Sequence, residues 1–310
     1  ALLAIVAWLT VRWCDDPDGP KADKTLVLIA YVLGIGYGVH MAGMLPAPAV
    51  GLAILIRRPR TILRWKLLAA CVGVLVLGAT PFLTQPIRAA HFPAGNEGEP
   101  TGCREKIALN CTFSKQTYTA FMYNFNREQY GKPELADRRG VPFSAQIGMW
   151  WYYFKWQWIR DAHNEHPGLQ GALAAVFLVL GLLGGWVHYK RDPQSFTFFG
   201  PLMFTLTLLL IYYLNFLYGA SQAPELGDSV PREVRDRDYF YLWSFSAWSV
   251  WAALGLTYVW ESLAALLGTE KRALGDTPVD LPKNRHWAAT APLLLLAFVP
   301  LFANWSGASR

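Results

Sequence analysis

The sequence predicts an all-α membrane protein with seven or eight transmembrane segments and a partly ordered outer loop of about 80 residues. Hydrophobic residues make up 53% of the chain, and charged residues only 16%. Tryptophan occurs 14 times, and tryptophan and tyrosine favour the interface between bilayer and water. Several apolar runs reach the roughly 20 residues that a helix needs to cross a bilayer. These observations together indicate a polytopic chain.

The segments follow one another from the N-terminus. Residues 1–13 are apolar and read as the end of a span, without the basic region or cleavage site of a signal peptide. Residues 25–56 are also apolar, but Pro46 and Pro48 interrupt them, so they form either one kinked span or two half-spans. Further spans, each bounded by charge or proline, are expected at about 66–84, 169–189, 195–218, 240–267 and 287–304.

Basic residues in three connections predict the orientation of these spans. Short cytoplasmic loops carry an excess of lysine and arginine, which places the outer segments at 85–168, at 219–239 and at the C-terminus. The same residues account for much of the net charge of +6, so we expect no nucleic-acid partner. The basic connections contain Arg57, Arg58, Arg60, Arg64 and Lys66, then Lys190 and Arg191, then Lys271, Arg272, Lys283 and Arg285.

The chain is expected to divide into membrane segments at 1–84, an outer loop at 85–168 and later membrane segments at 169–310. The loop is too long for a simple connector. It ends in an aromatic run, which is typical of an interfacial helix in the headgroup plane; a platform for a sugar or a polyprenyl chain is the alternative. Cys103 and Cys111 both fall in this loop, in a compartment that permits disulfides, and are a candidate disulfide pair.

A run of charge stands against an aromatic segment late in the chain. Six of the seven residues from Arg232 to Asp238 are charged. Each charge would cost roughly 2.5–3.5 kcal/mol at the centre of a membrane helix, so the run is expected at the membrane surface. An anionic, lipid-linked ligand would meet the protein there.

Other motifs are more simply read as structure. Glycines at 34, 36 and 38 lie in an apolar segment, which favours close helix packing over a dinucleotide loop. His40 is expected to bond a neighbouring helix, with a proton relay as the alternative. The cluster of residues 163–166 reads as a solvated turn, and His91 and Glu97 lack a second ligand at suitable spacing. We therefore expect no metal and no cofactor.

Four segments carry a family resemblance: residues 33–41, residues 127–131, the charged run with the aromatics after it, and Asn304-Trp305. Together they resemble a large bacterial family of protein O-mannosyltransferase-like membrane proteins of the GT-C glycosyltransferase type. The resemblance implies a multi-pass protein of the bacterial inner membrane, with the large loop and the C-terminus on the periplasmic side. It also implies transfer of a sugar from a polyprenyl-phosphate donor on the outer face.

One departure from this family concerns catalysis. In such enzymes the catalytic acidic residue lies in the first outer loop, near a His-Pro-Pro-Gly-like turn, and the sequence contains no such motif. The chain is then either the later membrane part of an enzyme or a derivative without the chemistry. The catalytic residue is not identified by the sequence.

The resemblance gives the charged run a role. Lipid-phosphate donors are anionic, and arginine binds phosphate oxygens with two parallel hydrogen bonds. The candidate donor-phosphate residues are Arg232, Arg235 and Arg237, with Arg88 and Arg127 as further candidates. In the alternative, the three arginines of the run pair with Glu233, Asp236 and Asp238 and fix the loop.

A second class of function stays open beside the enzyme. The chain is expected to contact the lipid bilayer in either case. As a non-catalytic subunit it would pack against other membrane proteins through its aromatic outer loop. A transporter is disfavoured, because the spans contain little charge and show no internal repeat.

Overall fold

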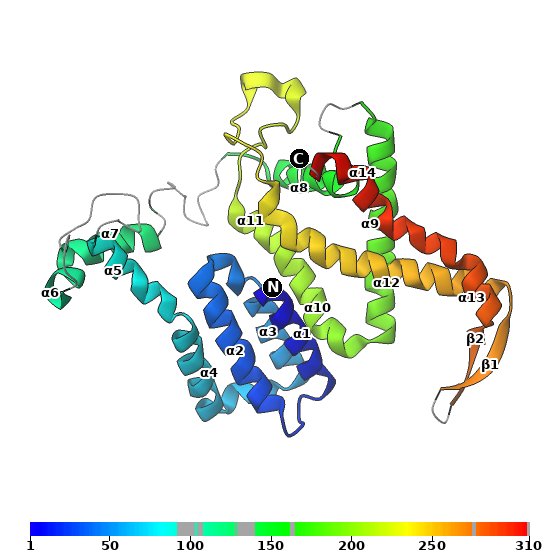
Figure 1. The fold of residues 1–310 in the computed structure, drawn as a ribbon, viewed down its shortest axis with the longest axis horizontal. Helices are drawn as coiled ribbons and strands as arrows, with labels where there is room; N and C mark the ends of the chain where they lie inside the picture. The colour runs from blue at the N-terminus through cyan, green and yellow to red at the C-terminus, as the bar shows by residue number, and fades with distance from the viewer. Residues whose placement is uncertain are drawn as a thin grey trace. The chain divides into compact units, whose positions relative to one another are not determined.

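The computed structural model describes residues 1–91, 103, 108–126, 128, 140–161, 165–274 and 277–308. Most of these residues are helical, as the sequence predicts (Figure 1). They form two compact units. Unit 1 comprises Ala1–Arg139 and Thr197–Thr205, and unit 2 comprises Gly140–Phe196 and Leu206–Arg310. The expected division at residues 84 and 168 stays a prediction.

Unit 1 begins with three apolar helices. The break expected near Pro46 separates two of them, so residues 25–56 form two helices with a 3-10 turn between. The α-helices are α1 (Leu2–Asp15), α2 (Ala22–Val39), α3 (Ala47–Arg57), α4 (Trp65–Gly78), α5 (Thr84–Ala90), α6 (Leu109–Thr112) and α7 (Lys115–Phe125). The 3-10 turns are η1 (Met41–Met44), η2 (Pro59–Leu63) and η3 (Thr80–Leu83).

Helices α2 and α4 pack through glycine (Figure 1). A β-carbon at Gly34 would overlap the backbone carbonyl oxygen of Leu75. One at Gly78 would lie 2.6 Å from the carbonyl oxygen of Tyr31. Because both neighbours are backbone atoms, no side-chain rotation could relieve the overlap. The glycines of α2 therefore serve helix packing, as the sequence favours.

Unit 2 contains longer helices and a hairpin. Helix α10 begins in unit 2 and continues into unit 1, where it contains Pro201, and it is followed by a single π-helical turn. A proline interrupts the hydrogen-bond ladder of a helix, which accounts for such a turn. The α-helices are α8 (Phe143–Trp158), α9 (Pro167–Arg191), α10 (Pro193–Phe204, shared with unit 1), α11 (Leu210–Leu214), α12 (Leu242–Leu266), α13 (Asn284–Thr290) and α14 (Val299–Ala308). The other turns are η5 (Thr205–Leu209, π), η6 (Pro224–Ser229), η7 (Asp238–Tyr241) and η8 (Ala291–Phe298).

Indole hydrogen bonds join α8, α9 and α12. The Trp248 indole N–H donates to the Phe177 carbonyl oxygen of α9 at 3.0 Å, and glycine at position 181 leaves room for this ring. The Trp150 indole N–H donates to the Ser244 hydroxyl of α12 at 3.0 Å. The rings of Trp158 and Phe177 stack with 4.0 Å between centroids. The aromatic run ending the expected outer loop thus forms a helix, α8, whose rings pack largely inside unit 2.

The apolar helices indicate a membrane protein. Within the described residues, four helices are long and apolar enough to cross a bilayer: Ala22–Val39, Pro167–Arg191, Pro193–Leu214 and Asn284–Trp305. A fifth is possible if Trp65–Gly78 and Thr80–Arg88, bent by 45°, form one span. The expected seven or eight spans are therefore not confirmed. Helix α12 has the length of a span, but its serines, Tyr258 and Glu261 lower its hydropathy.

A two-stranded hairpin follows α12, where the sequence predicts only a basic loop (Figure 1). Strand β1 (Thr269–Leu274) pairs antiparallel with β2 (Thr277–Pro282). Pro278 and Pro282 disfavour a helix here, because proline lacks a backbone N–H. The fold is thus mostly, and not wholly, α-helical.

Substitution at Gly34 tests the packing of α2 on α4. We expect Gly34→Ala to lower the free energy of unfolding by about 1–3 kcal/mol, the usual cost of overpacking. The matched control is Gly73→Ala on α4, where a β-carbon meets nothing within 4 Å. Alanine has a higher helix propensity than glycine, so we expect the free energy of unfolding of Gly73→Ala to stay unchanged or to rise by up to about 1 kcal/mol. Unfolding in detergent measures the free energy of unfolding of both variants. Equal changes in the two would contradict the packing of α2 on α4 at Gly34.

Candidate functional site

The candidate site is built on residues 215–241, the connection between α11 and α12, called here the 215–241 loop. Asn215 ends α11 in the left-handed conformation, with φ of 46°. The two arms of the loop then meet. The Glu233 N–H donates to the Tyr218 carbonyl oxygen at 2.8 Å, and the Tyr218 N–H donates to the Pro231 carbonyl oxygen at 3.2 Å. These two bonds close the base of the loop.

Amide side chains attach the 215–241 loop to α8. The buried Gln146 amide donates to the Asn215 side-chain oxygen at 3.2 Å and to the Phe216 carbonyl oxygen at 2.8 Å. The Gln222 amide donates to the Ala145 carbonyl oxygen of α8 at 2.9 Å. Buried amides need such partners, because an unpaired one would lose its hydrogen bonds to water. Helix α8 is therefore the scaffold of the loop.

Arg232 stabilises the backbone of the loop. Its guanidinium donates to the carbonyl oxygens of Gly227 (3.1 Å), Gly219 (3.2 Å), Ala223 (2.7 Å) and Gln222. These bonds use four of the five N–H groups of an arginine. The geometry favours the alternative in which this arginine fixes the loop, although its partners are carbonyls instead of the expected carboxylates.

Asp236 joins the loop to α8 through Tyr153. The Tyr153 hydroxyl donates to the Asp236 carboxylate at 2.9 Å, and the Ser221 N–H donates to the same oxygen at 3.1 Å. The hydroxyl in turn accepts from the Arg237 N–H at 3.3 Å. Burial raises the pKa of the Tyr153 phenol, and the bond to Asp236 adds to that rise, so the phenol is neutral near pH 7. The sequence carries no signal for this contact, because its members are distant along the chain.

Arg237 forms the one ion pair found in the described part of the loop. Its guanidinium lies 3.0 Å from the buried Glu233 carboxylate and 5.3 Å from the centroid of the Phe216 ring. Its buried Nε has no hydrogen-bond partner. This pairing matches the local alternative that the sequence left open.

Arg235 is the most accessible arginine of the charged run. The side chain is exposed, beside Val234, which is 96% exposed. Its guanidinium lies 3.4 Å from the Tyr239 hydroxyl and 5.8 Å from the centroid of that ring. Both contacts are weak and at the surface. Arg235 is therefore the residue of the run best able to bind an anion.

The other predicted residues are dispersed. Arg88 is exposed on α5 of unit 1, and Arg127 lies outside the described residues. Cys103 and Cys111 form a disulfide, with 5.6 Å between Cα atoms. His40 caps η1, accepting from the Ala42 N–H at 3.1 Å instead of bonding a neighbouring helix.

The expected turn near residue 165 is partly visible. The N–H groups of Glu165 and His166 donate to the Asp161 carboxylate at 2.8 and 2.7 Å, while His163, Asn164 and Glu97 lie outside the described residues. Among the residues described, no group of three or more His, Cys, Asp or Glu side chains could hold a metal ion.

A serine, a histidine and an aspartate meet at the start of α10, but not as a catalytic triad. The His188 Nδ1 accepts from the Trp251 indole N–H at 3.2 Å, so Nε2 carries the proton towards Ser195, at 2.7 Å. Ser195 donates its own proton to Asp192. In a triad the serine proton points to histidine. Although burial opposes it, the bonds from Ser195 hold the Asp192 pKa below its usual value, as suits a helix cap.

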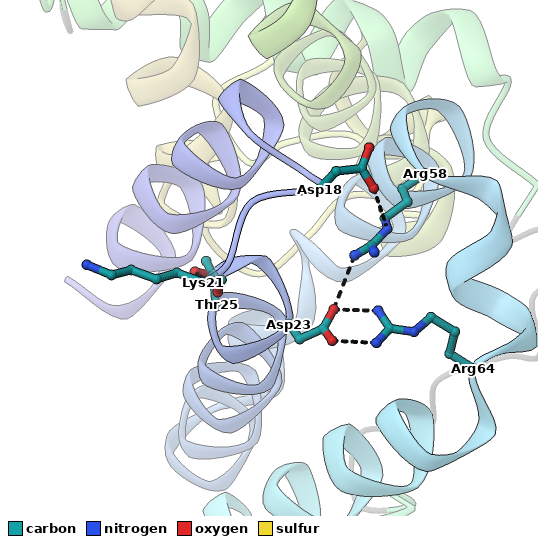
Figure 2. A network of polar contacts seen from close by, with 6 residues as sticks. All are labelled: Asp18, Lys21, Asp23, Thr25, Arg58 and Arg64. Carbon is teal, nitrogen blue, oxygen red and sulfur yellow. Dashed lines mark hydrogen bonds and ion pairs between the residues drawn. The ribbon is translucent and has the colours of Figure 1, made fainter.

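A second charged cluster lies in unit 1, where the basic connection after α3 meets the start of α2 (Figure 2). Arg64 binds the Asp23 carboxylate with two N–H groups, each at 2.5 Å. Arg58 bridges Asp23 at 3.1 Å and Asp18 at 2.9 Å. The partners are 35 or more residues apart, so the sequence did not indicate the cluster. It fixes the basic connection against α2.

Comparison with known proteins gives one match, to a family model. Residues 1–63 match the model described as the protein O-mannosyl-transferase TMEM260 N-terminal domain. The match covers α1, α2, α3 and the Arg58 pairs with Asp18 and Asp23. No curated protein and no solved structure matches the chain. The family match suggests a glycosyltransferase and is consistent with the O-mannosyltransferase-like resemblance.

Alanine substitutions at Arg232 and Arg235 distinguish an arginine that stabilises the loop from one that is only exposed. We expect Arg232→Ala to leave carbonyl oxygens unpaired and to lower the local opening free energy of the loop by about 1.5–3 kcal/mol. The amide protons of Tyr218 and Glu233 would then exchange with solvent about tenfold faster or more. Arg235→Ala is the matched control and should change this free energy by less than about 0.5 kcal/mol. Equal exchange in the two variants would refute the role of Arg232.

Proposed function

We propose that this chain is a membrane glycosyltransferase of GT-C type, or the C-terminal membrane part of one, that takes a sugar from a polyprenyl-phosphate donor on the outer face. In this proposal the protein lies in a bacterial inner membrane. The 215–241 loop and residues 85–168 face the periplasm, and the three basic connections face the cytoplasm. The single observation that carries the proposal is the match of residues 1–63 to an O-mannosyl-transferase domain.

Arg235 supports the phosphate part of the proposal. It is exposed and its partners are the hydroxyl and the ring of Tyr239, so binding a phosphate would break no ion pair. A charged hydrogen bond to phosphate is stronger than the one it would replace. Arg237 could bind the phosphate only through N–H groups that do not pair with Glu233. The Arg232 guanidinium already donates hydrogen bonds to backbone carbonyl oxygens. The phosphate would therefore bind chiefly to Arg235.

The loop also offers a rigid support for this arginine. Its base is closed by two backbone hydrogen bonds, and Gln146 and Tyr153 attach it to α8. Binding residues held by a fixed framework lose less conformational entropy when the ligand binds. The chain does not supply an identified catalytic carboxylate, so the reaction would require an acidic residue beyond those assigned here.

A non-catalytic subunit is the second candidate. The engagement of Arg232 and Arg237 within the loop favours it, because two of the three candidate phosphate ligands already have partners. In addition, none of the apolar window of Asn284–Trp305 is buried within the structure, as suits a helix that contacts lipid or another protein. Such a subunit would co-purify with membrane partners and would transfer no sugar.

Orientation can be tested with introduced cysteines. In spheroplasts, we expect Val234→Cys to react with a membrane-impermeant maleimide, because this side chain is almost fully exposed on the proposed outer face. Arg285→Cys, also exposed but in a basic connection, should react only after permeabilisation. The unsubstituted protein is the control, since Cys14 is buried and Cys71 half-buried. Reversed labelling would invert the proposed topology.

Donor binding can be tested in the complete product of the gene. We expect Arg235→Ala to raise the donor KM about tenfold or more, the effect of losing one charged hydrogen bond. Arg285→Ala removes the same charge from the opposite face and should leave the KM unchanged. An unaltered KM in Arg235→Ala would exclude this arginine as the phosphate ligand. Absence of transfer by the unsubstituted protein from every polyprenyl-phosphate sugar tested would favour the non-catalytic subunit.

A further inference from the structure

Unit 1 contains an apolar cavity of about 330 Å³ between α2, α3, η2 and α4. Its wall is aliphatic almost throughout and includes Leu26, Leu33, Val50, Ile54 and Cys71. The volume lies in the range of ligand pockets in proteins. All lining residues belong to unit 1, so the cavity does not depend on where unit 2 lies.

One polar group interrupts this wall. The Thr61 side chain lines the cavity, is 2% exposed, and its hydroxyl has no hydrogen-bond partner. A buried hydroxyl without a partner costs free energy that a bound acceptor or donor would recover. Position 61 thus indicates a ligand with at least one polar atom at this depth.

Two basic residues adjoin lining residues in the sequence. Arg60 immediately precedes Thr61, and Lys66 immediately precedes Leu67, another lining residue. Arg60 and Lys66 are exposed and take no part in the cluster of Figure 2, in which Arg58 and Arg64 bind Asp18 and Asp23. The acidic residues of that cluster are therefore occupied. Arg60 and Lys66 thus form no ion pair with that cluster.

We infer that this cavity is a binding site for an anionic phospholipid. One acyl chain would occupy the aliphatic interior, the Thr61 hydroxyl would bond an ester or glycerol oxygen, and the phosphate would lie between Arg60 and Lys66. Three observations carry the inference: the apolar cavity, the unpartnered hydroxyl that lines it, and two exposed basic residues next in sequence to its lining. A transmembrane helix of another chain would fill the cavity but would not use the charge.

The site is distinct from the proposed donor site. It lies in unit 1 beside a basic connection, whereas Arg235 lies in unit 2, in the 215–241 loop. In bilayers whose inner leaflet is anionic, basic residues next to membrane helices attract acidic lipids. A bound lipid would hold α2, α3 and α4 together at one end of the unit.

Native mass spectrometry of the full chain in mild detergent tests this site. The probes are phosphatidylglycerol and phosphatidylcholine with the same acyl chains, and glycerol phosphate without chains. We expect one tight site for phosphatidylglycerol, at least tenfold weaker binding of phosphatidylcholine, and no retention of glycerol phosphate. Equal binding of the two lipids, or retention of glycerol phosphate at the same affinity, would overturn the inference.

Variants locate the site. A β-carbon at Gly51, which lines the cavity, meets nothing within 4 Å, so Gly51→Leu should fill the interior without a backbone clash and lower the affinity at least tenfold. Gly73→Leu on α4 is the matched control; its β-carbon is also unobstructed, but it does not line the cavity, and the affinity should stay within twofold. Equal effects of the two substitutions would exclude the cavity.

Two further variants probe the polar contacts without filling the cavity. Arg60→Ala combined with Lys66→Ala should reduce phosphatidylglycerol binding to the level of phosphatidylcholine. Thr61→Val keeps the shape and should weaken binding about two- to tenfold, the worth of one hydrogen bond. These surface and isosteric changes keep the inference testable if Gly51→Leu fails to fold. Unchanged lipid affinity in both variants, or self-association of the chain blocked by Gly51→Leu, would assign the cavity to a protein helix.

Discussion

Close approach of helix backbones at glycine is the contact on which both units depend. In unit 1 it brings α2 against α4 at Gly34 and Gly78. In unit 2 a β-carbon at Gly184 or Gly255 would overlap backbone atoms of the facing helix, α12 or α9. Between apolar helices in lipid there is little hydrophobic driving force, so tight van der Waals packing must supply the attraction. Because α12 begins directly after the 215–241 loop, this packing also fixes one end of the candidate site.

The helices were predictable from sequence, whereas their surroundings were not. Apolar runs and prolines located α2, α3, α9 and α12 to within a few residues. The aromatic run of α8 predicted a helix at the membrane surface, but its rings pack within unit 2, because tryptophan serves equally as an interface anchor and as a buried donor. The β1–β2 hairpin was missed, since six-residue strands rich in charge resemble a loop.

The candidate site shows the same limit more sharply. The sequence located the charged run in a loop, but it did not reveal which arginines would be engaged in hydrogen bonds and ion pairs within that loop. Arg232 binds carbonyl oxygens, which no sequence pattern marks, and Asp236 binds Tyr153, 83 residues away. Only Arg237 follows the local charge pairing, with Glu233 four residues before it. The alternating charge therefore predicts a loop, but it does not predict the contacts of the charged side chains, of which Glu233 is buried.

Arg232 has a consequence for the interpretation of related sequences. The Arg232 side chain supplements the two backbone hydrogen bonds that close the base of the loop, and lysine, with three donors, could not reproduce its four hydrogen bonds. Natural selection would then retain this arginine because its loss lowers the yield of folded protein. An arginine retained at this position among homologues would thus be the signature of a loop conformation, and inheritance of the neighbouring Arg235 would be the better guide to shared chemistry.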